Sequence, residues 1–138
     1  MTVLDNIPTG FERHFRRSGF TDPWEPLYSQ RRADAIYLGL RAGPAHANSR
    51  GLVHGGLLTT LADNAMGLSC GQASGDTLSL VTVNLSMDFV VAARQGQWIE
   101  VRSTVIKVGK SLSFASAVVM ADDRICARAN ATFLGVPR

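Results

Sequence analysis

The stretch of the chain that decides its fold is residues 55–73, which read GGLLTTLADNAMGLSCGQA. Apolar residues recur in it at intervals of three and four, the period of an α-helix that buries one face. These residues are Leu57, Leu58, Leu61, Ala62, Ala65 and Leu68. Gly71 and Gly75 indicate where the helix ends. We therefore predict one long helix from Gly55 to about Ala73, surrounded by the rest of the chain on most of its sides.

The residues on either side of this helix alternate between apolar and polar, which predicts β-strands. One such segment, Ala35–Arg41, precedes the helix. Four follow it, namely 81–91, Trp98–Val108, Leu112–Met120 and Ile125–Phe133. Short polar turns separate these four, and turns this short favour antiparallel neighbours, so we expect a meander. The pattern predicts an α+β fold in which a curved antiparallel sheet of five to six strands wraps around the helix.

Length and composition favour a single domain. The chain has 138 residues, of which 46% are hydrophobic and 18% charged. This is long enough to bury a substantial core and too apolar for a disordered chain. We expect residues 33–138 to form the domain and residues 1–32 to form an arm that belongs to it. No apolar stretch approaches the ~20 residues of a membrane-spanning helix. Met1–Gly10 lacks the order of a signal peptide, which predicts a cytoplasmic protein.

The arm has its own pattern. Thr9 and Glu12 have the spacing of a capping box, which predicts a short helix from Gly10 to Arg17. Pro23 and Pro26 prevent such a helix from continuing, because the residue before a proline is pushed towards extended backbone. We therefore expect a short helix followed by an irregular segment that lies over the core.

The net charge of +3 favours anionic partners, and a phosphate-bearing small molecule would satisfy it. Basic residues are scattered and no aromatic-rich basic motif accompanies them, so we do not predict a nucleic-acid partner. Cys70 and Cys126 are too few for a disulfide framework or a cysteine-based metal site, and we expect both in the interior. His14 and His46 have no partners at metal-ligand spacing and are expected on the surface.

The run NSRGLVHGG, residues 48–56, leads directly into the predicted helix. Two glycines at a helix start allow a ligand to approach closely, and the free N–H groups of a first turn suit a developing oxyanion. Asp63 is the only acidic side chain in the helix, and burying it is costly unless it is hydrogen-bonded or used. Taken alone, these features fit equally well with close packing of the glycines and a solvent-facing Asp63.

In combination, the residues of this region resemble the motif of hotdog-fold acyl-CoA thioesterases of the phenylacetate-degradation type. The matching positions are Asn48, Gly51, His54, Gly55, Gly56, Leu61, Asp63, Ala65 and Gly67. The likeness extends from Ile36 to Gly135 and includes Thr82 and the turn at residues 109–112. The motif is specific, because it fixes several residue types at set spacings within one strand–loop–helix unit.

The resemblance implies a role for each of five residues. Asp63 would be the catalytic carboxylate, as a nucleophile or as a general base on water. The N–H of Gly55 would polarise the thioester carbonyl, and Asn48 and His54 would orient the site. The ring of His54 could instead only bond the loop backbone. Thr82, a threonine where relatives commonly carry a serine, would help to position the water.

Further residues are assigned to substrate binding: Gly56, Arg50, Lys107, Lys110 and Ser111. Cations pair readily with phosphate, so the basic members of this set would meet the phosphates of coenzyme A, although a solvated surface explains any one of them. Three arm residues could line an acyl pocket or simply pack on the core, namely Trp24, Leu27 and Tyr28. We expect no metal or redox cofactor, because a thioester is already activated, and coenzyme A enters as part of the substrate.

The spacing of Gly55 and Asp63 predicts a dimer. Eight residues apart on one helix, they are separated by about 12 Å, whereas hydrogen-bond reach is about 3 Å. Two antiparallel copies of the helix across a two-fold axis would bring Gly55 of one copy opposite Asp63 of the other. The resemblance likewise implies homodimers, often paired into homotetramers.

We therefore predict that the chain hydrolyses an acyl-CoA thioester to a free acid and coenzyme A. Two alternatives remain open. A hotdog enoyl-CoA hydratase would place an Asp before a His in a short motif, whereas here His54 precedes Asp63. A non-catalytic acyl-CoA-binding module usually carries a DNA-binding segment, and the residues ahead of Ala33 leave little room for one.

Overall fold

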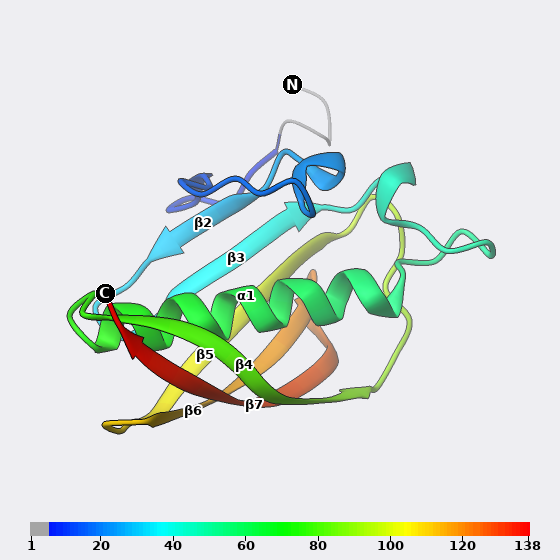
Figure 1. Ribbon diagram of the computed structural model, residues 1–138. Helices are drawn as coiled ribbons and strands as arrows, with labels where there is room; N and C mark the ends of the chain where they lie inside the picture. The colour runs from blue at the N-terminus through cyan, green and yellow to red at the C-terminus, as the bar shows by residue number, and fades with distance from the viewer. Residues whose placement is uncertain (1–5) are drawn as a thin grey trace.

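A computed structural model describes residues 6–138 as one long helix and seven strands (Figure 1). In chain order the elements are β1 (Glu12–Arg13), η2 (Asp22–Trp24), β2 (Tyr28–Arg31), β3 (Ile36–Arg41), η3 (Pro44–His46), α1 (Gly55–Ala73), β4 (Leu78–Phe89), β5 (Trp98–Val108), β6 (Leu112–Ala121) and β7 (Arg124–Pro137). The two η elements are single turns of 3₁₀-helix. The helix predicted from Gly55 to about Ala73 is confirmed with the same bounds.

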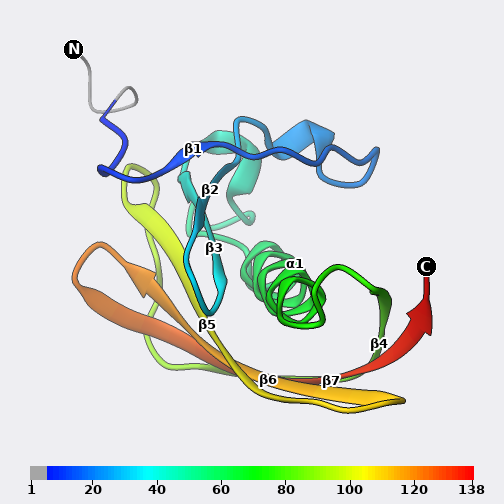
Figure 2. The ribbon, with the colours of Figure 1, turned by 90° about the vertical axis from the view of Figure 1, so that its left-hand side faces the viewer.

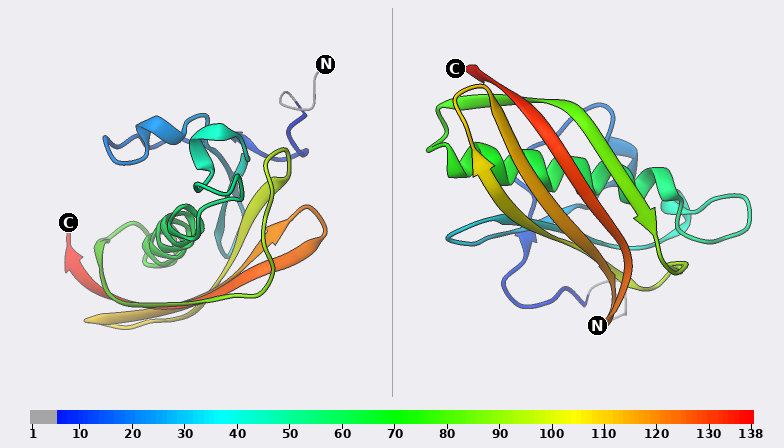
Figure 3. Two further views of the ribbon diagram at one scale, coloured as in Figure 1. Left: turned by 90° about the vertical axis from the view of Figure 1, so that its right-hand side faces the viewer. Right: turned by 90° about the horizontal axis from the view of Figure 1, so that it is seen from below.

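The seven strands form one antiparallel sheet in the spatial order β1-β2-β3-β5-β6-β7-β4. Seen along α1, the sheet curls around the helix (Figure 2). Strands β4 to β7 pass beneath the helix, as the right-hand view of Figure 3, seen from below, shows. Strands β2 and β3 lie on the other side of the helix (Figure 1). This is the predicted α+β architecture, the hotdog fold, with one more strand than the upper limit expected from sequence.

The core lies between α1 and the concave face of the sheet. Leu61, Ala62, Ala65 and Met66 of the helix are all completely buried. The strands beneath them present small buried residues, namely Ala115, Ala117 and Ala121 of β6 and Ala127, Ala129 and Ala131 of β7. Side chains this small leave room for the helix to lie close to the sheet, and close packing of this kind is typical of protein interiors.

The predicted meander is wrong in its first step, because β4 does not pair with β5. Strand β4 pairs with β7, from Leu78 opposite Pro137 to Phe89 opposite Ala127, and β5 pairs with β3 and β6. Residues 90–97 connect β4 to β5, and a segment of that length can span up to ~26 Å. It therefore crosses the three strand spacings, each ~4.8 Å, that separate β4 from β5. The consequence is that β4 lies at an edge of the sheet.

The arm differs from its prediction in two ways. No helix forms at residues 10–17, because Gly10 has a φ of +95° and Glu12–Arg13 pairs with β2 instead. A helix of eight residues is marginal on its own, so strand pairing wins. Second, Tyr28–Arg31 was expected to be irregular but pairs with β3 along its length. These two strands account for the larger sheet.

The two cysteines lie in the interior, as predicted, and neither forms a disulfide. Burial raises the pKa of the Cys70 thiol to about 11, so it stays protonated at neutral pH. Within residues 6–138, no helix is both long and apolar enough to cross a membrane. The first five residues, on which part of the signal-peptide prediction rests, lie outside the described residues.

Ser69 ties the helix to the sheet. It lies completely buried on α1, accepts a hydrogen bond from the Ile36 N–H at 2.9 Å and donates one to the Ala65 carbonyl at 2.7 Å. Ile36 is the first residue of β3, and it is buried. A buried donor that loses its acceptor costs the full desolvation penalty of that group.

We expect Ser69→Ala to lower the free energy of unfolding by about 1–3 kcal/mol, because it leaves the Ile36 N–H without its acceptor. Urea denaturation followed by circular dichroism measures this change, with Ser49→Ala on the exposed loop as the matched control. Equal stability of the two variants would contradict the assigned role of Ser69.

Candidate functional site

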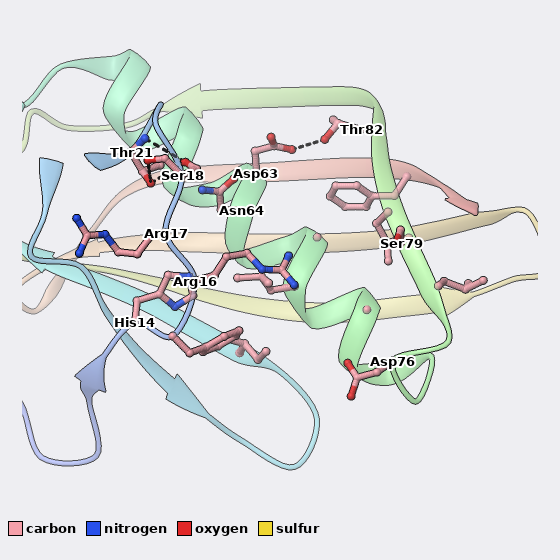
Figure 4. Close-up of a pocket in the computed structure, with 18 of the residues that line it drawn as sticks. His14, Arg16, Arg17, Ser18, Thr21, Asp63, Asn64, Asp76, Ser79 and Thr82 are labelled. Carbon is pink, nitrogen blue, oxygen red and sulfur yellow. Dashed lines mark hydrogen bonds between the residues drawn. The ribbon is translucent and has the colours of Figure 1, made fainter. Parts of the chain in front are cut away.

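A cleft with a volume of about 660 Å³ contains Asp63. It lies between α1, the start of β4 and the arm. The helix contributes Asp63 and Asn64, and the strand contributes Leu80 and Thr82. Figure 4 shows the arm residues His14, Arg16 and Arg17 on one side of the cleft and Thr82 on the other. We call this hollow the Asp63 cleft.

Asp63 is held by Thr82. The Thr82 hydroxyl donates a hydrogen bond to Oδ1 of Asp63 at 2.7 Å (Figure 4). Hydrogen bonds to an ionised carboxylate are short and strong, and this one fixes the rotation of the carboxyl group. Oδ2 remains for a second partner in the cleft. The sequence prediction paired the same two residues in one site, and the structure brings them together within a single chain.

A β-bulge in β4 turns Thr82 towards the helix. The pairing of β4 with β7 shifts between Thr82 and Asn84, which leaves Val83 as the extra residue. Before the bulge Thr82 meets Asp63, and after it Leu85 and Met87 pack against the core. In an unbroken strand these three side chains would not share a face, because alternate residues point to opposite sides. The bulge thus lets one strand serve both the core and the site.

The N-terminus of α1 presents one backbone donor. His54 is the N-cap, and its Nδ1 accepts the N–H of Gly56 at 2.8 Å. Leu57 and Leu58 donate to the His54 carbonyl. In the described part of the chain no acceptor is found for the N–H of Gly55. It therefore suits an oxyanion, and the helix dipole adds to its pull. Gly56 is not a second donor, because His54 already binds its N–H.

The neighbouring strand leaves little room for a side chain at the helix start. A Cβ at position 55 would lie 3.3 Å from Cζ of Phe89, at the end of β4. The ring therefore lies against the first residue of α1 and covers one side of it. This contact gives Gly55 a packing role beside the catalytic role predicted from the sequence.

Asn48 acts on its own loop. Its Oδ1 accepts the N–H groups of Arg50 at 2.9 Å and Leu52 at 3.1 Å, which shapes the turn that leads to His54. The side chain therefore holds the loop in place. His54 likewise bonds the backbone through its ring, in agreement with the structural alternative left open for it. Any contact of either residue with substrate stays a prediction.

The residues expected to bind coenzyme A are dispersed over the surface. Lys107 is exposed near the end of β5, Lys110 and Ser111 are exposed in the turn between β5 and β6, and Arg50 is exposed in the loop before α1. None of the four lines the Asp63 cleft. Their roles stay predictions. The three arm residues expected at an acyl pocket lie in different places. Leu27 is buried and lines the Asp63 cleft, Tyr28 packs near Trp98, and Trp24 lines a different hollow.

Sequence reasoning missed the arm as a wall of the cleft. Burial lowers the pKa of His14, which favours its neutral form. Arg17 pairs with Asp22 at 3.0 Å, while Arg16 and Arg31 also line the cleft. The cluster of basic residues was visible in the sequence, but no periodicity places an irregular arm over a helix. His46 was expected on the surface and is buried instead, with Nδ1 accepting from Gly43.

No group of three potential metal ligands gathers anywhere in residues 6–138. The Asp63 cleft is lined by the carboxylates of Asp63 and Asp76, by several hydroxyl groups and by arginines, and among these Asp63 and Thr82 form a hydrogen-bonded pair. Such a set suits attack on an activated carbonyl, with charge building up on oxygen, provided that an oxyanion donor is supplied.

Comparison with known proteins places this fold and cleft in a family. Residues 50–127, which contain α1 and Thr82, match the model of the thioesterase superfamily. Over 93% of this chain and 96% of the relative, the sequence is 37% identical to a Pseudomonas aeruginosa protein named "Putative esterase PA0474".

Two further proteins are similar over shorter spans. Human acyl-coenzyme A thioesterase 13 is 36% identical over 73 residues, which are 51% of this chain and 50% of that protein. The solved structure of BH2602 protein from Bacillus halodurans with CoA is 28% identical, with a TM-score of 0.72 over 80% of this chain and 74% of that one. The chain belongs to the thioesterase superfamily and is a thioester hydrolase.

Proposed function

We propose that the chain hydrolyses acyl-CoA thioesters at sites shared by two antiparallel copies, with Asp63 from one copy and the Gly55 N–H from the other. The observation that carries this proposal is the Thr82–Asp63 hydrogen bond of 2.7 Å, which aims a carboxylate into the cleft. The Gly55 N–H lies in the first turn of the same helix, and no acceptor is found for it among the described residues. Each copy would therefore contribute its Asp63 to one of the two sites and its Gly55 N–H to the other.

The carboxylate half supports attack on a carbonyl carbon. As a general base, Asp63 takes a proton from water, and the water oxygen attacks the carbonyl as the C–S bond breaks. As a nucleophile, Asp63 attacks first and water then hydrolyses the anhydride that forms. In both routes the coenzyme A thiolate leaves and takes up a proton. Thr82 keeps Oδ1 occupied, so Oδ2 is the reacting oxygen.

The second part of the proposed site, the Gly55 N–H, stabilises the oxyanion. A hydrogen bond from a fixed backbone N–H to the carbonyl oxygen strengthens as negative charge develops there. His54 contributes by capping the helix through Gly56, which leaves the neighbouring N–H of Gly55 for the substrate. Asn48 contributes by shaping the loop ahead of it. Both are positioning residues in this proposal.

The edge of the sheet supports the pairing of two copies. Strand β4 exposes Val81 and Val83 at 54% and 60%, and Phe89 and Val90 beyond them are exposed at 55% and 58%. A bare apolar edge strand is a site of association, because both its backbone groups and its side chains lack partners. Antiparallel pairing of β4 with its own copy would place the two α1 helices antiparallel. Pairing of such dimers into homotetramers stays a further proposal, as does a cytoplasmic location.

The substrate class is supported by the relatives. One is named as an acyl-coenzyme A thioesterase and another was solved with CoA. In this chain the net charge of +3 favours a substrate that carries phosphates. The cations that we assign to those phosphates are Lys107 near the end of β5, Lys110 in the β5–β6 turn, and Arg50.

We expect Asp63→Asn to lower kcat for acetyl-CoA hydrolysis at least about a hundredfold, because the amide can neither accept the proton nor attack. Thiol release followed with a chromogenic disulfide measures the rate, and thermal unfolding checks that the fold is intact. Asn64→Asp and Asp76→Asn serve as controls for general effects of charge near the cleft. Retention of most activity in Asp63→Asn would contradict the proposed role.

We expect Thr82→Val to lower kcat by about tenfold to a hundredfold, since a hydrogen bond to a charged group is lost while the shape is kept. Thr82→Ser retains the hydroxyl and should stay within about threefold of the parent rate. Steady-state kinetics of the two variants compares them directly. If both variants lose activity equally, the hydroxyl is not what matters at this position.

We expect Gly55→Pro to abolish hydrolysis by removing the N–H. Proline suits the first position of a helix, and His54 before it is already extended, with φ −67° and ψ 133°. Mixing Gly55→Pro chains with Asp63→Asn chains under conditions of subunit exchange should restore activity. Half of the dimers would be mixed, each with one intact site, which gives about a quarter of the parent rate.

The mixing result distinguishes a shared site from one built within a single chain. A self-contained site would stay inactive in every mixture. Thermal unfolding of Gly55→Pro is the control, because the new ring must fit beside Phe89. Mixing each inactive variant with itself gives the baseline rate.

A further inference from the structure

The wall of the Asp63 cleft that the arm and β2 form is rich in positive charge. Arg16 and Arg17 line it from the arm, and Arg31 lines it from the end of β2 (Figure 4). Arg17 is paired with Asp22 at 3.0 Å. In the part of the chain that the structure describes, Arg16 and Arg31 form no ion pair with an acidic side chain. Two guanidinium groups therefore line the cleft without an anionic partner.

Arg31 is held in place by an aromatic ring. Its guanidinium lies over the ring of Phe15, with Cζ 4.1 Å from the ring centroid. Burial is the main cause of the lowered pKa of His14, and the charges of Arg16 and Arg31 lower it further, so these three side chains lie close together. A guanidinium that stacks on a ring keeps its planar edge of N–H donors available, and this edge matches the two oxygens of a carboxylate. The two arginines are thus suited to bind a carboxylate.

The arginines and Asp63 lie at different levels along α1. Arg31 pairs with Ile36, and the Ile36 N–H is bound to Ser69 of the helix. Ser69 follows Asp63 by six residues, which corresponds to a rise of about 9 Å along the helix axis. A ligand that contacts both Asp63 and the arginines is therefore an elongated molecule.

The cleft offers an apolar surface between these two levels. Gly67 and Leu68 line it from α1, and Leu80 lines it from β4. Both leucines are only half-buried. Gly67 has no side chain to cover the ring of Phe133, which would lie 3.3 Å from a Cβ at that position. Apolar groups that are still partly exposed to water gain when methylene groups cover them. The cleft therefore combines a reacting carboxylate, an apolar surface and two cations.

We propose that the substrate is an acyl-CoA whose acyl group ends in a carboxylate, which Arg16 and Arg31 bind while its methylene groups lie on the apolar surface of the cleft. The inference rests on the proposed function, since it needs the thioester carbonyl at Asp63. The cations that we assign to the phosphates of coenzyme A lie outside this cleft, which leaves it for the acyl group. The reaction is the same hydrolysis: water adds to the carbonyl carbon, the C–S bond breaks, and a dicarboxylate and coenzyme A are released.

Hydrolysis of adipyl-CoA and hexanoyl-CoA by the full chain tests this inference, because the two acyl chains are equally long and only the first ends in a carboxylate. We expect the parent protein to have a kcat/KM at least about fivefold higher for adipyl-CoA than for hexanoyl-CoA. In Arg16→Met and in Arg31→Met, this ratio should fall about tenfold, mainly through the KM for adipyl-CoA. The reason is that a hydrogen bond between two charged groups is lost while most of the side-chain stem is kept.

Arg32→Met is the matched control. Arg32 follows Arg31 in the chain and also stacks on an aromatic ring, with Cζ 4.7 Å from the ring centroid of Tyr37, but it does not line the Asp63 cleft. This variant loses the same charge and should keep the parent ratio between the two substrates. Thermal unfolding of all three variants checks that the fold is intact.

The inference is overturned if the parent protein does not prefer adipyl-CoA, if neither cleft variant changes the ratio, or if the cleft variants lose activity equally on both substrates. Equal loss would assign the two arginines to a phosphate of coenzyme A, which both substrates carry. Failure of the proposed function looks different, because the parent protein would then release no thiol from either substrate.

Discussion

The structure depends on the close packing of α1 against the alanine-lined face of β6 and β7. Because the side chains beneath it are small, the helix lies deep in the curled sheet and buries Leu61, Ala65 and Met66 completely. Ser69 then fixes its position along the sheet through the backbone of Ile36. A helix held this firmly is a rigid base for reactive groups, and rigid placement is what electrostatic catalysis needs. The position of the candidate site therefore depends on the packing of the core.

The same rigidity is the reason why the proposed site uses two copies of the chain. One helix carries the proposed oxyanion donor at its first turn and the carboxylate two turns later, and a straight helix cannot bring both to one carbonyl. The edge position of β4, with its exposed valines, offers the surface by which a second helix would be brought alongside. In this arrangement the Asp63 cleft of each chain would hold the reacting carboxylate.

The sequence predicted the helix, its bounds and most strands, because those depend on local periodicity. It also paired Asp63 with Thr82, through the resemblance rather than the pattern. It failed where distant parts of the chain decide the outcome. The partner of β4 is set by a crossing connection, and residues 10–17 take their shape from pairing with β2. His46 is buried only because the arm folds over it. None of these contacts can be predicted from the spacing of apolar and polar residues along the sequence.

The bulge at Val83 has a consequence for how related sequences are compared. The extra residue follows Thr82, so it leaves the interval of 19 residues between Asp63 and Thr82 unchanged and lengthens the interval from Thr82 to the core residues Leu85 and Met87. Chains that lack the bulge could therefore hold the same pair of side chains with the core residues that follow in the strand one position closer in sequence. A pattern search that demands a constant interval across the bulge would overlook them, whereas alignment of the strands in space would not.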